Sequence, residues 1–129
     1  MLLFDGVTTI TLPDDLEWVD EYDWNTIQQD VQPMVGGGIV VSENVLTAGR
    51  PITLVSGENV WITKTVLDEV YTMLNVADKQ MTLTLPDART FTVMFKRDGD
   101  KPIEAKPVWR KTIQLTADYY TLTLKLMEV

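Results

Sequence analysis

Threonine alternates with large apolar residues in four stretches of this 129-residue chain, and a period of two restricts the folds it can adopt. In an extended strand, neighbouring side chains point to opposite faces, so such a stretch buries Leu, Ile, Phe or Val on one face and leaves threonine on the other. The stretches are residues 7–12, 81–85, 90–95 and 120–126. The pattern predicts half-buried strands.

Turn residues between these stretches favour antiparallel pairing. Residues 86–89, Pro-Asp-Ala-Arg, predict a hairpin that joins the second and third stretches. Residues 97–100 contain an Asp-Gly pair that tolerates positive φ and predict another turn. An antiparallel sheet is therefore expected.

Three weaker strands complete the expected sheet. Two short apolar runs, 38–41 and 52–55, have strand character. Residues 103–108 are expected at an edge, because Pro102 and Pro107 have no N–H to donate to a neighbouring strand.

One helix is expected near residues 64–75. Apolar residues recur there at helical spacing, at positions 66, 67, 70, 71, 73 and 74. Thr63 or Thr65 is suited to cap its start, and Asp68 with Glu69 would favour the positive end of the helix dipole.

These elements predict a mainly β domain of the β-rich α+β kind, a small antiparallel barrel or split barrel with the helix plugging or flanking the sheet. The length fits one domain over residues 1–129, and 45% hydrophobic with 23% charged residues is typical of a globular protein. An acidic, aromatic-rich segment, about 1–35, is expected to extend to neighbouring molecules.

Histidine and cysteine are both absent from the chain. Their absence excludes Ser-His-Asp and Cys-His nucleophile systems, thiolate or imidazole metal sites, iron–sulfur clusters and disulfides. We expect no enzymatic activity, no cofactor and no metal. No apolar run reaches the roughly 20 residues that span a bilayer, and Asp5 interrupts the first apolar residues too early for a signal peptide. Synthesis in the cytoplasm is expected.

Charge is distributed unevenly. Residues 1–49 contain nine acids and no Lys or Arg, whereas the remainder has eleven bases and ten acids, so the first part carries −9 and the second +1. A one-signed acidic segment repels phosphate backbones and anionic lipids, so we expect neither nucleic-acid nor membrane binding. A basic protein partner is favoured, with an association rate that falls as salt rises.

The densest polar cluster is residues 14–24, in which six carboxylates alternate with three aromatic residues. It lacks the glycine of a helix–loop–helix calcium site, and its carboxylates and rings suit a glycosidase no better than any acidic segment would. We interpret it as a protein contact, because Trp and Tyr are common interface anchors. Trp18 or Trp24 is the expected hot spot, and the first 30 or so residues are expected to be dispensable for folding. The interface candidates here are Asp14, Asp15, Trp18, Glu21 and Trp24.

Three further features are candidate sites. Gly36-Gly37-Gly38 is followed by no Lys-Ser or Lys-Thr and precedes a strand, so a hinge, bulge or close backbone approach is favoured over phosphate binding. Arg50 is the first basic residue of the chain and a further interface candidate. Two interpretations stay open: Arg50 pairs with an acid of residues 14–23, or it is an ordinary surface arginine. Trp109, beside Arg110 and Lys111, belongs to a basic stretch that acids interrupt, and is a further interface candidate.

With these residues in view, the chain resembles small tail proteins of phages and phage-derived tails, in particular the ripcord-type subunits around the central spike and hub of contractile-tail baseplates. The resemblance rests on residues 12–18 with Asp20, Glu21 and Trp24, on Gly37-Gly38, and on 48–54, 89–93 and 122–126. It implies a structural subunit located in the virion. It also implies contacts with other tail or baseplate proteins and with copies of itself in a ring.

Two other functional classes stay open. One is a carbohydrate-binding or small hydrolytic domain that uses Trp18 or Trp24 with nearby carboxylates. The other is a cellular adaptor that binds one protein partner.

Overall fold

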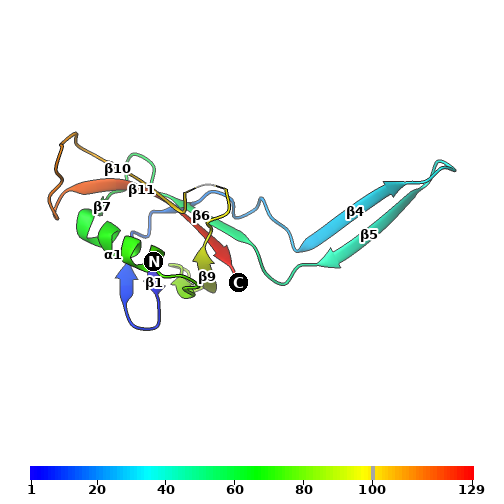
Figure 1. Ribbon diagram of the computed structural model, residues 1–129, viewed down its shortest axis with the longest axis horizontal. Helices are drawn as coiled ribbons and strands as arrows, with labels where there is room; N and C mark the ends of the chain where they lie inside the picture. The colour runs from blue at the N-terminus through cyan, green and yellow to red at the C-terminus, as the bar shows by residue number, and fades with distance from the viewer. Residues whose placement is uncertain (100) are drawn as a thin grey trace.

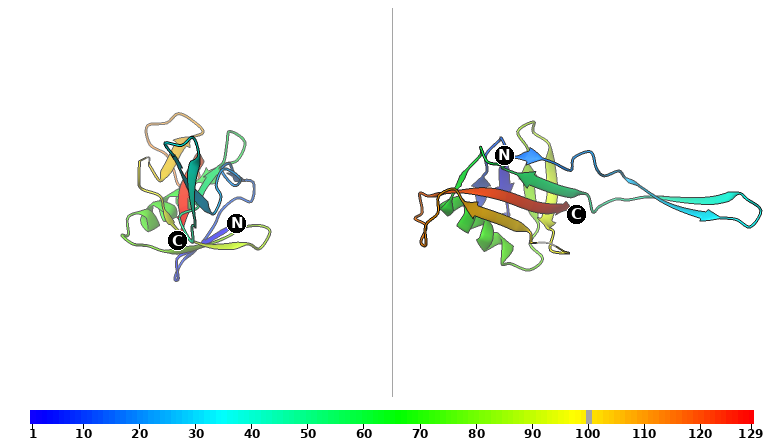
Figure 2. Two further views of the ribbon diagram at one scale, coloured as in Figure 1. Left: turned by 90° about the vertical axis from the view of Figure 1, so that its right-hand side faces the viewer. Right: turned by 90° about the horizontal axis from the view of Figure 1, so that it is seen from above.

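The computed structural model describes residues 1–99 and 101–129 as two parts of different shape, a β-sheet body and a two-stranded arm. The arm projects far from the body in Figure 1 and in the view from above in Figure 2, and both chain termini lie in the body. The molecule is therefore elongated, although most of its residues belong to the body.

Among the described residues, the body contains nine strands in one antiparallel sheet and one helix, and the arm adds a separate two-stranded sheet. The longest path through the main sheet runs β2-β1-β8-β9-β11-β6-β3. In chain order the strands are β1 (Leu2–Phe4), β2 (Thr9–Thr11), β3 (Glu17–Trp18), β4 (Ile27–Pro33), β5 (Ile39–Val45), β6 (Pro51–Val55), β7 (Ile62–Thr63), β8 (Met81–Thr84), β9 (Thr90–Phe95), β10 (Ile103–Pro107) and β11 (Tyr119–Glu128).

Strand β11 organises the body because it pairs along both of its edges. One edge pairs with β10 near its start and with β9 near its end, and the other pairs with β7 and then β6. Its Leu122, Leu124 and Leu126 are buried and alternate with partly exposed residues. The threonine alternation thus predicts the central strand of the sheet correctly.

The other alternating stretches also form strands, so the mainly β prediction with one helix is confirmed. The hairpin at 86–89 joins β8 to β9, and Ala88 there has φ +69°. The 97–100 turn is described only in part, since Asp100 lies outside the described residues, and Gly99 has φ +97°. Of the two expected forms, a barrel or a split barrel, a closed barrel does not form among the described residues. In the described residues β2 and β3 are the ends of the pairing path and do not pair with each other.

Helix α1 (Lys64–Leu74) packs one side against the sheet through the buried residues Leu67, Val70 and Met73. It therefore flanks the sheet. Thr63 occupies the N-cap position in extended geometry, but its side chain forms no capping hydrogen bond. The expected dipole contribution is wrong, because the first turn contains no acidic residue and both Asp68 and Glu69 come after it. No helix of the described chain is long and apolar enough to cross a membrane.

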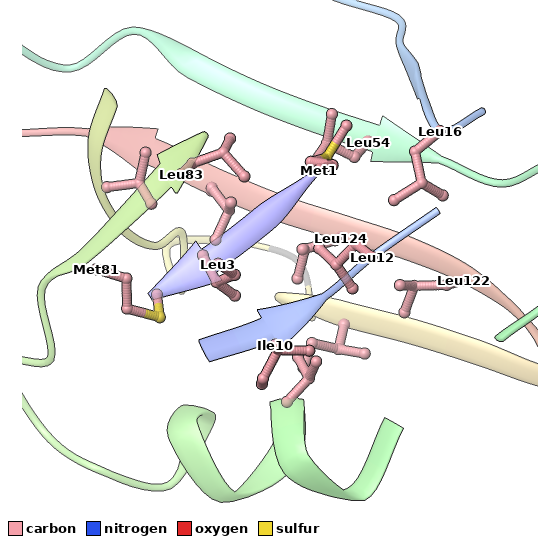
Figure 3. Close-up of a cluster of buried hydrophobic side chains, with 14 of the residues drawn as sticks. Met1, Leu3, Ile10, Leu12, Leu16, Leu54, Met81, Leu83, Leu122 and Leu124 are labelled. Carbon is pink, nitrogen blue, oxygen red and sulfur yellow. The ribbon is translucent and has the colours of Figure 1, made fainter. Parts of the chain in front are cut away.

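The first strands of the chain supply a large share of the core. Met1, Leu3, Ile10, Leu12 and Leu16 are buried together with side chains from β6, β8 and β11, as Figure 3 shows. In the same figure Ile10 faces helix α1, with which β2 makes contact. The expectation that the first 30 or so residues are dispensable for folding is wrong for β1 and β2, because their side chains fill the body.

Candidate interaction surface

The arm, residues 27–45, is a hairpin in which every residue of both strands is exposed. Strands β4 and β5 pair over seven positions, from Ile27 opposite Val45 to Pro33 opposite Ile39. Within the described chain their extensive contacts are with each other. Because an isolated two-stranded hairpin is at best marginally stable in water, an exposed ribbon of this length is well suited to a partner's surface.

The register sorts the arm's side chains into two chemically different faces. Residues opposite each other share a face, so the pairs formed by Ile27, Val31 and Pro33 lie on the same side of the ribbon. We call this the apolar face. Its apolar members are Ile27, Val31, Pro33, Ile39, Val41 and Val45, and one polar pair, Gln29 donating to Glu43 at 2.7 Å, crosses it.

The opposite face of the arm is polar. It contains Gln28, Asp30, Gln32, Ser42 and Asn44, with Val40 as its one apolar side chain in the paired strands. Such a one-sided distribution of apolar side chains is typical of a sheet that packs against another surface through one face only. Both strands of the arm are exposed along their whole length in the described chain, so the apolar face is a candidate contact surface.

The glycine run forms the tip of the arm. Gly37 has φ +89° and donates its N–H to the Met34 carbonyl at 3.1 Å, while the Met34 N–H binds the Gly38 carbonyl at 2.8 Å. Residues with a Cβ rarely adopt such a φ, which explains the glycine. Of the expected conformational roles, hinge, bulge or close backbone approach, the bulge is correct, because these two hydrogen bonds and the positive φ of Gly37 are those of a three-residue hairpin loop with a glycine bulge.

Hydrogen bonds fix the root of the arm to the sheet. The Asp20 carboxylate accepts from the Thr53 N–H and from its hydroxyl, both at 2.9 Å. On the returning strand, Gly49 donates to the Glu128 carbonyl at 2.8 Å. The two connecting segments are therefore tied to neighbouring strands of the body, one to β6 and the other to β11.

Arg50 joins the same root, although not through a carboxylate. Its guanidinium donates to the Glu21 backbone carbonyl at 2.8 Å, while the Glu21 carboxylate pairs with Arg89 at 3.0 Å. The hydrogen bonds that the Arg89 guanidinium donates to the carboxylates of Glu21 and then Asp87 raise the pKa of Arg89 above its usual value. Arg50 thus contacts the acidic segment within the molecule, but Arg89, which sequence reasoning passed over, makes the ion pair.

Trp18 packs into the body beside this cluster. Its ring meets Phe91 edge to face at 5.5 Å between centroids, and the guanidinium carbons of Arg50 and Arg89 lie 4.6 and 5.7 Å from the indole centroid. The side chain is half-buried against the hydrophobic core. Its contacts are therefore largely internal to the chain.

We expect Trp18→Ala to lower the free energy of unfolding by about 2 kcal/mol, because it removes a partly buried ring and its edge contact with Phe91. Trp18→Phe should recover part of the loss. Urea unfolding followed by circular dichroism measures both variants, with Tyr22→Ala as the control at a fully exposed ring of the same segment. A Trp18→Ala chain as stable as the parent would show that the ring is free for a partner.

The remaining candidates of the acidic segment lie around the root and the first strands. Asp14 accepts a hydrogen bond from the Met1 amino group, and its side chain stays largely exposed. Asp15 is exposed, and Trp24, which lies shortly before the first strand of the arm, is half-buried. The structure therefore brings Trp18, Glu21 and Arg50 together, and Asp14 lines a pocket with Trp18 and Glu21.

Trp109 belongs to a second exposed cluster at the opposite end of the body. Its ring lies 5.8 Å from that of Trp61 and 6.2 Å from that of Tyr119, and all three are more than a third exposed. Ile113 and Leu115, in the loop between β10 and β11, are 78% and 64% exposed. We call these five residues the far-end patch, because Figures 1 and 2 show this loop at the end of the long axis remote from the arm.

Asp118 holds the loop of the far-end patch in place. Its carboxylate accepts from the Leu115 N–H at 2.7 Å and pairs with the Lys111 ammonium at 3.1 Å. These partners, the Leu115 N–H first, hold the pKa of Asp118 below its usual value of 3.8. The patch is therefore built on an ordered loop.

A pKa lowered by folding means that the ionised carboxylate stabilises the folded loop. This contribution is complete above pH 3.8 and is lost as the pH falls through the lower, folded-state pKa of Asp118. We expect the amide signal of Leu115 in nuclear magnetic resonance spectra to titrate with a midpoint below 3.8, and Asp118→Asn to remove that titration and speed Leu115 amide exchange several-fold at neutral pH. A midpoint at or above 3.8 would contradict the assignment.

Comparison of the chain with protein-family models, with curated proteins and with solved structures finds no match.

Proposed function

We propose that this chain is a structural subunit of a multi-protein assembly, of the phage tail or baseplate kind that its sequence resembles. The observation that carries the proposal is the arm, a ribbon with both strands exposed and one apolar face. Exposed apolar patches of this kind mark interaction sites in folded proteins. An arm held at its root by β6 and β11 can reach a neighbour without disturbing the body.

The contacts of Trp18 also favour an assembly role over carbohydrate binding. A sugar platform needs an open ring face, whereas two guanidinium groups lie over the Trp18 indole and Phe91 meets its edge. Titration of the chain with oligosaccharides, monitored by tryptophan fluorescence, is expected to leave the emission unchanged.

Incorporation into particles tests the proposal. Tail particles are purified from the host strain that carries the gene, and the chain is sought in them by mass spectrometry and by immunogold labelling. We expect it in the tail or baseplate. A Val31→Lys chain, altered on the apolar face, should accumulate in the host but be lost from particles by at least about tenfold, as for an interface hot spot.

Gln32→Lys is the matched control, because it adds the same charge at the next residue on the polar face. It should be incorporated like the parent chain. Complete tails that lack the parent chain, or that take up Val31→Lys as readily as the control, would refute the proposal.

A further inference from the structure

The apolar face of the arm is exposed, and the far-end patch is a second exposed apolar surface against which it could be buried. Val31, Val41 and Ile39 are 47%, 46% and 63% exposed on the arm. Trp61, Trp109 and Tyr119 present three rings, and aromatic residues are enriched in the buried centres of protein interfaces. The two surfaces have the chemistry of complementary halves of one contact.

Charge distinguishes this pairing from contact between two arms. The arm contains Asp30 and Glu43 but no Lys or Arg, so two arms laid together would place acids of the same sign side by side. Residues 104–118, which include the loop of the far-end patch, contain the bases Lys106, Arg110 and Lys111 and the acids Glu104 and Asp118, so this region carries +1 although Asp118 pairs with Lys111. The arm is therefore attracted to the far end of a neighbour and repelled by another arm.

The position of the two surfaces decides the kind of assembly. The arm and the far-end patch lie at opposite ends of the molecule (Figures 1 and 2), so one copy cannot fold its own arm back onto its own patch without leaving the geometry seen here. A contact between two different surfaces of identical chains is heterologous. Its repetition produces a ring if the rotation closes and an open filament if it does not.

We propose that the apolar face of the arm docks on the far-end patch of a second copy of this chain, in a head-to-tail series. The inference deepens the proposed function, on which it rests, by naming the partner of the arm as another copy. Valine and isoleucine side chains of the arm pack on the rings of Trp61, Trp109 and Tyr119. Glu43, which lies on the apolar face, comes beside the basic loop of the neighbour, while Asp30 on the polar face adds to the overall acidic charge of the arm.

Complementation between two defective variants tests this pairing. Val31→Lys damages only the arm, and Trp109→Ala damages only the patch. Sedimentation velocity of the purified full chain should show concentration-dependent self-association of the parent, weakened by more than about tenfold in each variant alone. An equimolar mixture should form a dimer and nothing larger, because one intact arm meets one intact patch and no further site remains.

Gln32→Lys on the polar face should associate like the parent, and Val41→Lys should reproduce Val31→Lys; circular dichroism confirms that each variant is folded. If Trp109→Ala associates like the parent while Val31→Lys does not, the arm has another occupant and the inference is overturned. Failure of the mixture to form a dimer overturns it as well.

The salt dependence of association is an independent test of the same pairing. The association rate of the parent should fall as ionic strength rises past roughly 0.15 M, where the Debye length is about 8 Å. A rate that does not depend on salt would overturn the placement of the acidic arm beside the basic loop. A parent chain that stays monomeric at every concentration also overturns the inference, whereas the proposed function then still stands if the chain is found in tail particles.

Discussion

A chain without residues 1–12 is expected to be unfolded. The deletion removes β1 and β2 and with them four buried side chains, Met1, Leu3, Ile10 and Leu12. At about 2 kcal/mol for each buried side chain, the loss is about 8 kcal/mol, which is comparable with the whole stability of a domain of this size. The deletion also exposes one edge of β8, which β1 covers. Circular dichroism and urea unfolding measure the outcome.

Removal of the arm is the matched control for this deletion. The Leu46 N–H donates to the Thr26 carbonyl at 2.6 Å, so residues 27–45 can be replaced by Gly-Gly as a two-residue turn. Because both arm strands are exposed, we expect the free energy of unfolding to stay within about 1 kcal/mol of the parent. A folded chain without residues 1–12, or an unfolded chain without the arm, would reverse our assignment of body and arm.

Leu124→Ala is expected to cost about 3 to 4 kcal/mol of unfolding free energy. Leu124 is fully buried in the middle of β11, opposite Ile103 on one neighbouring strand and Leu54 on the other. Its truncation loses transfer free energy and leaves a cavity that strands paired on both edges cannot close. Chemical denaturation at neutral pH measures the change.

Thr123→Ala, one residue earlier and on the other face of β11, controls for the loss of strand propensity. We expect it to cost less than about 1 kcal/mol, because Thr123 is only partly buried. Equal losses in the two variants would mean that β11 contributes through its hydrogen bonds and not through one-sided packing.

The strands that the sequence predicts are those in which apolar residues alternate with polar ones and the apolar side chains are buried in the body. In β8, β9 and β11 the apolar side chains at every second position face the core, so the period of two and the structure agree. Helix α1 is found for the corresponding reason, since its apolar side packs on the sheet. Strand β1 is missed because three residues are too few to show a period.

The arm is the main element that the sequence does not reveal. Residues 27–33 contain glutamine, aspartate and proline, which are poor strand formers, and their apolar residues cover no part of this chain's core. Only 38–41 is predicted, as a short strand, whereas β5 extends to Val45 and lies outside the body. The signal that was available is the glycine turn between two stretches whose apolar residues match in register.

Figure 2 shows β6 and β11 running along the same long axis as the arm, which bears on how this molecule carries mechanical load. The arm returns directly into β6, and β6 pairs with β11 over five positions. A pull along the arm therefore drags β6 lengthwise past β11 and loads their ladder in shear, with all of its hydrogen bonds strained together. Ladders pulled in this direction must break as a unit, whereas ladders peeled from one end open bond by bond. We therefore expect a larger force to be needed to unfold the body by pulling along the arm than by pulling an edge strand perpendicular to its length.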